Sequence, residues 1–438
     1  MDNQHLDELM AFCAIPSVSD DAGSCRAAAE FLVAAMEQRG ISARLVETPG
    51  NPVVVGEKRG ASERAILFYS HYDVVPEGDV AGWQSPAFEP RIRDGRLWGR
   101  GTADHKGSVL ARIQALDLLA GVGEELPVSL RYVVEGSEEV GSPGLLDVLT
   151  SLKGDLTAEG GFYSGWSRDI EGRPRVNGGG RGAAGVRVEV SNANRDLHGS
   201  FAPLVRSPLT SLTRLLAGMY DEHGRVTVPG FHDGAVAPSD ADRAVLERVP
   251  FNVEVAREEL GIRRFAGESE ERLELVTRHF FSPALSFFGL EGSGVPGKGV
   301  PASASVTVRA SLVPQQEPEQ VMAALTAYFE QQSDLPVTVT PLRTGRRPVR
   351  APLESRSVQV AAQAAESVYG QPPVVIPFSS GGGPRDLFMQ ALGLPLIADA
   401  GVSHLGSNDH AADENIYTEH YLNGVRYYAE IMRLWVAD

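Results

Sequence analysis

The spacing of apolar and polar residues predicts alternating strands and helices in the first third of the chain. Four short apolar runs with polar, Gly or Pro residues at their ends predict strands, at Ser42–Val46, Pro52–Val55, Ala65–Tyr69 and Val128–Val134. Helical patterns lie around Glu30–Gln38 and from about Lys106 to Leu119, and Gly40 and Gly121 follow them where a C-cap belongs. This order is typical of a sheet with helices on both faces.

The pattern changes in a glycine-rich segment around Gly178 and changes back near Arg350. The residues between them predict a smaller α+β arrangement, with strand Val186–Val190, a helix near Leu204–Met219, a long polar stretch, strand Ala304–Val313, helix Glu317–Gln331 and strand Pro336–Thr340. The acidic run Glu268–Glu274 is predicted to lie on a solvated helix face. After Arg350 the first pattern resumes, with a strand at Pro395–Ala398.

We therefore predict an α/β fold in which a domain with a mixed sheet, flanked by helices, is interrupted by a smaller α+β domain. The first domain would comprise residues 1–182 and 346–438, and the inserted domain residues 183–345. A chain of 438 residues, 42% of them hydrophobic, is long enough and apolar enough for more than one core.

Charge and cysteine content narrow the class of protein. The formal net charge of −17 argues against a nucleic acid or an anionic membrane as partner, because neither is attracted to an acidic surface. Cys13 and Cys25 are too few for a disulfide framework. No apolar run is long enough to cross a bilayer, and the first residues lack a signal-peptide pattern. We expect a cytoplasmic protein.

Residues able to bind a metal follow several of the predicted strands. His71 and Asp73 come directly after the strand Ala65–Tyr69, and residues two apart on an extended chain project to the same side. A carboxylate behind an imidazole is the arrangement that orients metal-bound histidines. Asp104 ends a glycine-rich loop, and Glu138-Glu139 follow another strand. Each also has a simpler interpretation, as a strand-end histidine, a helix N-cap or a solvated loop.

The last third of the chain adds His404 and His410 with several carboxylates, in a loop after the strand Pro395–Ala398. Open α/β sheets place their sites at the carboxyl ends of strands, so these groups are expected to converge. Imidazole and carboxylate ligands suit Zn²⁺ or Mn²⁺ and argue against Ca²⁺ or Mg²⁺. Gly180–Gly185 matches G-x-G-x-x-G, but a strand follows instead of a helix, which excludes a dinucleotide site.

Four segments resemble the signature motifs of the M20 metallopeptidases, a group of dipeptidases, carnosinases and N-acyl-amino-acid deacylases. They are SHYDVVPEGDVAGWQSPAFEPRIRDGRLWGRGTADHKG (Ser70–Gly107), EGSEEVGSPG (Glu135–Gly144), DLHGS (Asp196–Ser200) and NDHAADENI (Asn408–Ile416). The motifs follow the family's order and span nearly the whole chain. The resemblance implies a metal-binding catalytic domain and an inserted lid and dimerisation domain.

The resemblance also implies a centre of two divalent metal ions, with zinc preferred and manganese or cobalt as alternatives. The implied ligands are His71, Asp104 (bridging both ions), Glu139, Glu159 and His410. Glu159 is chosen because a glycine follows it, as in the family's short motif, whereas Asp155 and Asp169 lack that glycine.

By the same resemblance, Glu138 would act as general base, and Asp73 would orient His71 from behind. His198 would donate a hydrogen bond to the oxyanion from the partner subunit of a homodimer. The partners expected are this second copy and a small-molecule substrate, with no nucleic acid and no membrane.

Some positions depart from the family pattern and leave the substrate open. Ser379 and Ser311 stand where the family carries arginines, and Arg309 and Arg385 are the nearby candidates to replace them. His105 stands where the family mostly has Asp or Asn. We expect hydrolysis of the C–N bond of a dipeptide or N-acyl amino acid. The alternatives are a non-peptide C–N bond, as in an aryl amine or a specialised amide, and a non-hydrolytic binding relative.

Overall fold

The computed structural model describes residues 2–164, 168, 172–259, 261–294, 299–342, 345–379, 382–404 and 406–437. The chain forms two compact units. The first consists of Met1–Gly180 together with Arg350–Asp438, and the second of Arg181–Val349. The short strands β9 (Gly179–Gly180) and β14 (Val349–Arg350) lie where the chain leaves the first unit and returns to it.

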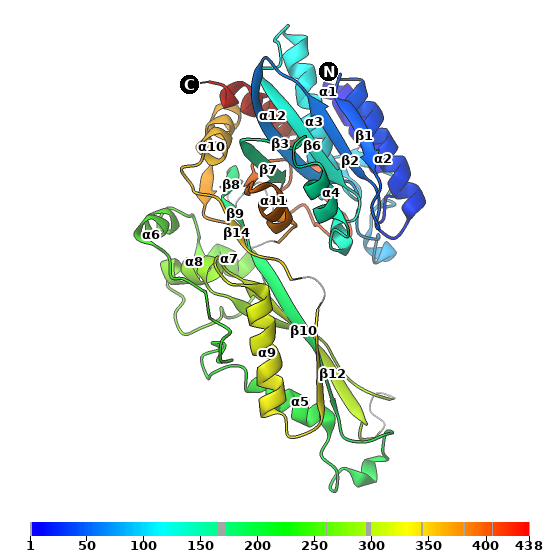
Figure 1. Cartoon of the computed structure of the whole chain (residues 1–438), viewed down its shortest axis with the longest axis vertical. Helices are drawn as coiled ribbons and strands as arrows, with labels where there is room; N and C mark the ends of the chain where they lie inside the picture. The colour runs from blue at the N-terminus through cyan, green and yellow to red at the C-terminus, as the bar shows by residue number, and fades with distance from the viewer. Residues whose placement is uncertain are drawn as a thin grey trace. The chain divides into compact units, whose positions relative to one another are not determined.

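The first unit is built on an eight-stranded mixed sheet of order β1-β2-β6-β3-β7-β16-β8-β15 (Figure 1). Its strands are β1 (Ser42–Val46), β2 (Val53–Lys58), β3 (Ser62–His71), β6 (Val128–Glu135), β7 (Gly160–Ser164), β8 (Arg175–Asn177), β15 (Val374–Ile376) and β16 (Leu396–Asp399). Strands β6, β3, β7 and β16 are parallel neighbours, and β1 and β2 join one edge in antiparallel pairing. The parallel centre brings the carboxyl ends of four strands to one edge.

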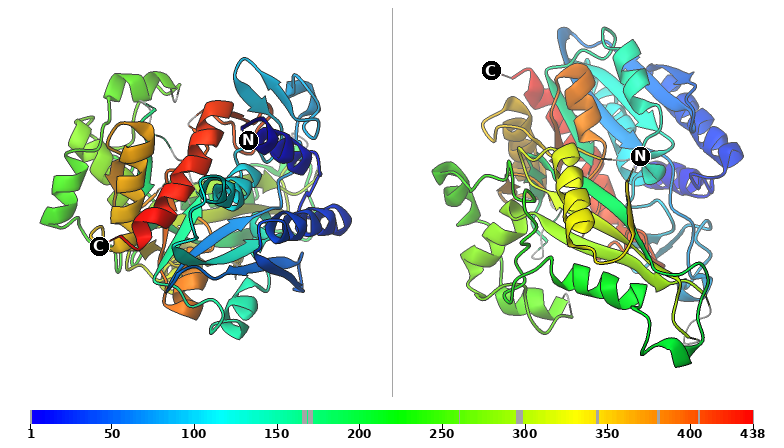
Figure 2. Two further views of the ribbon diagram at one scale, coloured as in Figure 1. Left: turned by 90° about the horizontal axis from the view of Figure 1, so that it is seen from above. Right: turned by 60° about the horizontal axis from the view of Figure 1, so that its bottom comes forward.

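Helices cover both faces of this sheet, so its central strands are apolar on both sides. They are α1 (Asp2–Cys13), α2 (Ala22–Glu37), α3 (Lys106–Gly121), α4 (Leu145–Ser151), α10 (Arg356–Tyr369), α11 (Arg385–Leu392) and α12 (Thr418–Trp435). Ile66 and Phe68 of β3 belong to the core that includes α3 and α12, whereas Leu67 and Tyr69 belong to the core formed with α4 and α11. Figure 2 shows α3 and α12 side by side.

A second, three-stranded sheet of the first unit joins the chain before α3 to the chain before α12. It consists of β4 (Arg91–Arg93), β5 (Arg96–Trp98) and β17 (Asn415–Tyr417). The short 3-10 helices η1 (Val80–Gly82) and η2 (Glu138–Val140) lie in loops of the same unit. The pairing of β5 with β17 holds the loops that follow β5 and precede β17 close together.

The second unit contains a four-stranded antiparallel sheet of order β11-β12-β10-β13. The strands are β10 (Gly182–Ser191), β11 (Ala284–Gly292), β12 (Ser303–Leu312) and β13 (Val337–Pro341), and the helices are η3 (Gly199–Phe201), α5 (Pro208–Ala217), α6 (Asp240–Leu246), α7 (Val253–Glu259), α8 (Arg272–Phe281) and α9 (Pro318–Gln332). Alternate residues of β10 and β12, such as Val188 and Val306, form a core with Leu212 of α5 and Phe329 of α9.

The mixed α/β class predicted from the sequence is confirmed, and β1 has the predicted bounds. The sequence pattern did not reveal β7, whose first two residues are glycines. A Cβ added at Gly160 would lie 2.2 Å from the indole of Trp435, so this strand carries glycine because α12 packs against its backbone. The helices α6 and α7 lie in the stretch that the sequence marked only as polar, and the acidic run falls largely before α8.

Candidate active site

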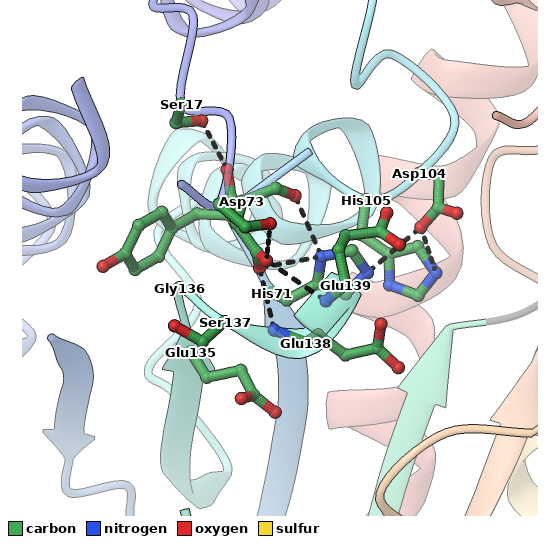
Figure 3. Close-up of polar contacts among 12 residues, drawn as sticks. Ser17, His71, Asp73, Asp104, His105, Glu135, Gly136, Ser137, Glu138 and Glu139 are labelled. Atoms are coloured by element: carbon green, nitrogen blue, oxygen red, sulfur yellow. Dashed lines mark hydrogen bonds and ion pairs between the residues drawn. The ribbon is translucent and has the colours of Figure 1, made fainter. Parts of the chain in front are cut away.

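Strands β3 and β6 end beside each other, and His71 marks the end of β3. His71 pairs in register with Glu135, the last residue of β6. Its Nδ1 lies 3.0 Å from the backbone oxygen of Asp73 and 3.3 Å from Asp73 Oδ1. Its Nε2 lies 3.0 Å from Oδ1 of Asp104 (Figure 3). The imidazole is therefore fixed through Nδ1 and presents Nε2 to Asp104.

Asp73 is fully buried and ties His71 to the glutamate pair. Its Oδ2 accepts a hydrogen bond from Ser19 Oγ at 2.7 Å. Its two carboxylate oxygens also accept hydrogen bonds from the backbone N–H groups of Glu138 and Glu139, each at 3.2 Å. Asp73 thus holds the imidazole and the start of η2 in a fixed relation, and the contact expected between His71 and Asp73 is present.

Asp104 stands between two groups of potential ligand atoms. Its Oδ1 lies 3.0 Å from His71 Nε2 and 3.2 Å from His105 Nε2. Its Oδ2 lies 3.1 Å from Nε2 of His410, which in turn lies 3.2 Å from Glu139 Oε1. The groups His71–Asp104–His105 and Asp104–Glu139–His410 each bring three ligand atoms within 4.8 Å of one another. Asp104 belongs to both groups, and its two oxygens divide between them.

Glu414 holds the loop that carries Asp104, a role that the sequence analysis missed. Its carboxylate is fully buried and accepts hydrogen bonds from the backbone N–H groups of Gly101, Ala103 and Asp104 at 2.9, 2.9 and 3.0 Å. Arg100 Nη1 donates to the same carboxylate at 2.8 Å. Gly101 adopts a φ of +84°, a conformation that glycine reaches without strain. In the sequence Glu414 stands between the polar residues Asp413 and Asn415, so no local pattern distinguishes it from a solvated acidic residue.

The electrostatics of the cluster favour charged ligands. Burial alone would raise the pKa of Asp104, but the neighbouring His105 and hydrogen bonds from His410 and His71 lower it well below its ordinary value. Burial opposes a charge on His71, yet hydrogen bonds to Asp104 and Asp73 raise its pKa well above the usual range. Hydrogen bonds to Asp104 and Glu139 raise the pKa of His410 to about 10. The carboxylates therefore attract positive charge to this cluster, as a cation site requires.

Glu138 lies beside the two groups and belongs to neither. Burial raises its pKa to about 7; His71 opposes the rise, and the charges of Asp104 and Glu139 add to it. Below the cluster, Glu135 accepts hydrogen bonds from Tyr69 Oη at 2.6 Å and from Ser142 Oγ at 3.0 Å. Burial raises the pKa of Glu135 to about 8. A glutamate with a pKa near 7 is suited to accept and return a proton at neutral pH.

Glu159 does not lie with the cluster. It precedes β7, and its backbone N–H donates to the carbonyl of Ala65, near the amino end of β3. Because β3 and β7 are parallel and Gly160 is paired with Ile66, Glu159 lies at the opposite end of these strands from His71, roughly 20 Å away along the strand. Its half-exposed carboxylate binds Arg64 Nε at 2.8 Å. The glycine that follows Glu159 made it resemble a ligand motif, but that glycine is needed for the packing of Trp435.

The other residues named from the sequence occupy different surroundings. Asp155 is exposed and pairs with Arg44 at 3.2 Å, while Asp169 lies outside the described residues. His198 belongs to the second unit, where its exposed ring contacts Ser200 Oγ at 2.9 Å. Arg309, also in the second unit, is exposed. The structure thus brings together His71, Asp73, Asp104, Glu138, Glu139 and His410, and adds His105.

Two imidazole rings and a tyrosine ring lie in contact with one another between the cluster and the guanidinium of Arg385. The ring centroids of His71 and His105 are 4.4 Å apart, and those of His105 and Tyr163 are 5.2 Å apart. The Arg385 guanidinium lies 4.3 Å from the centre of the Tyr163 ring. Arg385 is 3% exposed, and among the described residues no carboxylate forms an ion pair with it. A buried cation without an acidic partner is available for an anionic ligand.

A carboxylate shared by two ligand groups, next to a glutamate outside both, is typical of hydrolases that use two metal ions. The sequence matches peptidase family M20/M25/M40 over residues 67–434, and the chain belongs to this family.

Individual proteins that are similar to this chain are also peptidases of this kind. The chain is 26% identical to the Beta-Ala-His dipeptidase of Rattus norvegicus, in an alignment that covers 87% of this chain and 79% of the relative. It is 26% identical to a Cys-Gly metallodipeptidase of Candida albicans, with 96% and 92% covered. Among solved structures, an M20 family metallo-carboxypeptidase from Sulfolobus solfataricus superposes with a TM-score of 0.91 at 29% identity, covering 99% of both chains.

The family assignment predicted from the sequence motifs is therefore confirmed. The protein is a metal-dependent hydrolase that cleaves an amide bond in a small substrate, and the described residues include two candidate metal-ligand groups. No helix within the described part of the chain is both long and apolar enough to span a membrane.

Proposed function

We propose that the protein is a dipeptidase with a dinuclear metal centre at His71, Asp104, Glu139 and His410. The observation that carries the proposal is the division of the Asp104 carboxylate between two ligand groups, one oxygen facing each. The donor set fits divalent cations, because two imidazoles and two carboxylates converge there, from the buried His71 to the more exposed His410. Its balance of nitrogen and oxygen atoms favours zinc, with manganese or cobalt as alternatives.

Glu138 is the general base in this proposal. Bound metal ions would supply a water of lowered pKa and would polarise the substrate carbonyl. Glu138 would accept a proton from the attacking water and return it to the leaving nitrogen, a role that suits its pKa of about 7. Asp73 keeps His71 in one orientation and fixes the backbone of Glu138 and Glu139. In this proposal the protein's own residues provide the general base, the metal ligands and the contacts that orient them.

A dipeptide is the substrate class that we favour. The relatives named above are dipeptidases and a carboxypeptidase, enzymes whose names denote cleavage next to a free terminal carboxylate. Arg385 can bind such a carboxylate, because it is buried, lacks an acidic partner among the described residues and lies on the ring that contacts His105. Ser379 stands where the family carries an arginine and has no positive charge to pair with a carboxylate. We therefore assign carboxylate binding to Arg385. A non-peptide amide remains the alternative.

We further propose that the protein is a cytoplasmic homodimer and that His198 acts across the subunit interface. The sheet of the second unit has β11 at one edge, where Phe288 and Leu290 are 53% and 47% exposed. An exposed apolar edge strand favours association with a second copy. Cys13 and Cys25 are free thiols, consistent with a reducing compartment.

Complementation tests the trans role of His198. Glu138→Gln and His198→Ala subunits, each inactive alone, are mixed and allowed to exchange. A mixed dimer has one site with both wild-type groups only if His198 comes from the partner subunit. Recovered turnover would support the proposal, while a monomer in solution, or no recovery after proven exchange, would contradict it.

The central experiment compares Glu138→Gln with Glu139→Gln. Loss of the general base should lower kcat by about 10²–10⁴-fold while both metal ions remain bound. Loss of a ligand at Glu139 should instead remove metal from the second group. Metal content by mass spectrometry and turnover of a dipeptide series separate the two. If Glu138→Gln lost metal and Glu139→Gln kept it, the two roles would be reversed.

A further inference from the structure

The first ligand group lacks the carboxylate that the sequence motifs assign to it. Glu159 lies at the other edge of the sheet, bound to Arg64. Around His71 and Asp104, the third ligand atom that the described residues bring within 4.8 Å is Nε2 of His105. The question is therefore whether His105 only packs in the site or completes the first metal position.

The geometry of His105 is that of a ligand already in place. Its Nε2 lies 3.2 Å from Asp104 Oδ1, the same oxygen that lies 3.0 Å from His71 Nε2. The two rings are 4.4 Å apart between centroids and tilted by 30°, and both Nε2 atoms face the same oxygen of Asp104. Tyr163 packs against His105 at 5.2 Å, and the imidazole is 7% exposed. No large rearrangement is needed for both nitrogens to reach one ion.

We infer that His105 is the third protein ligand of the first metal ion, which makes that position rich in nitrogen. The inference rests on the dinuclear centre proposed above. The first ion would be held by two imidazoles, His71 and His105, and by one oxygen of Asp104. The second would be held by one imidazole, His410, and by carboxylate oxygens of Asp104 and Glu139.

The two positions therefore differ in their choice of metal. Imidazole-rich sites favour Zn²⁺ or Co²⁺, whereas carboxylate-rich sites accept Mn²⁺. With His105 as a ligand, the first position selects zinc over manganese more strongly than the second does. Replacing His105 by aspartate should restore an oxygen donor and reduce this preference.

Metal titration of chelator-treated protein tests the inference without any activity assay. The samples are wild type, His105→Asn, His105→Asp and the control His420→Asn, which removes a half-buried imidazole that belongs to neither group. Wild type and the control should bind two Zn²⁺ per chain. His105→Asn should bind one of them at least 10–100-fold more weakly. His105→Asp should bind two ions and show a higher affinity for Mn²⁺ relative to Zn²⁺ than wild type does.

A measurement on the wild-type protein keeps the test independent of any folding defect in the variants. Paramagnetic proton NMR of the Co²⁺-loaded protein counts metal-bound imidazoles by their shifted N–H signals. Signals from three rings, those of His71, His105 and His410, are expected. Two rings only, or a His105→Asn variant that keeps two Zn²⁺ at wild-type affinity, would overturn the inference and leave the dinuclear proposal standing. A wild-type protein that binds no metal would overturn both.

Discussion

Replacing Glu135 by glutamine should make the folded protein less sensitive to alkaline pH. Glu135 is 2% exposed and receives hydrogen bonds from Tyr69 and Ser142 on one oxygen. Burial raises its pKa from 4.5 to about 8, with the charges of Glu138 and Asp73 adding to the rise. The folded state therefore prefers the protonated carboxyl. Glutamine has the same shape and keeps an oxygen that accepts both hydrogen bonds, but it cannot ionise.

The size of the effect follows from proton linkage. Between pH 4.5 and 8 the unfolded chain has released the proton of Glu135 while the folded chain still holds it. The free energy of unfolding then falls as pH rises, by about 1.4 kcal/mol per pH unit. Across this window the tendency of Glu135 to ionise lowers the free energy of unfolding by roughly 3 to 5 kcal/mol. The full decrease is reached above pH 8, and there is no decrease below pH 4.5.

Urea unfolding of the metal-free protein between pH 5 and pH 9 measures the difference. Metal ions are removed because bound cations would lower the pKa of neighbouring carboxyls. Glu135→Gln should gain stability over wild type as pH rises, by a few kcal/mol across the range. Glu63→Gln, which removes an exposed carboxylate from the neighbouring strand β3, is the control. A difference between Glu135→Gln and wild type that does not change with pH would refute the reasoning.

Three further variants probe the site and its supports. Glu159→Gln should leave metal content unchanged and cost less than about 1 kcal/mol, because its ion pair with Arg64 is half-exposed; loss of an ion on mass spectrometry would return Glu159 to the ligand set. Glu414→Gln should cost about 3–5 kcal/mol in urea unfolding, since it leaves Arg100 buried without its counter-charge. Unchanged stability would show that the loop is held by other contacts. Arg385→Met should raise KM for a dipeptide at least tenfold but not for the same dipeptide amidated at its C-terminus, and an equal rise for both would exclude a carboxylate contact.

Local patterns in the sequence predicted the central strands and the residues at their ends. The apolar run before His71 and the run before Glu138 are each long enough to identify a buried strand, and polar side chains that follow such strands meet at one edge. Asp104, Glu139 and His410 could be placed with them because motifs in family order connect distant parts of the chain.

What the sequence did not predict depends on contacts between distant segments. Glu159 and its glycine match a short motif, but the motif does not say at which end of a strand the carboxylate lies. The loop of Asp104 depends on Glu414, more than 300 residues later in the chain. The position of His105 against Tyr163 and His71 likewise follows from packing, and no periodic pattern encodes it.

The place of β16 in the large sheet has a consequence for synthesis on the ribosome. β16 pairs with β7, yet it is made only after the whole second unit. Until then β7 is an open edge of the nascent sheet, with unpaired backbone groups that favour aggregation. His410 and Glu414 emerge later still, so the candidate ligand group of Asp104, Glu139 and His410 cannot assemble before the second unit has been made. The order of the segments therefore delays assembly of the candidate site until the part of the first unit that follows the second unit has been made.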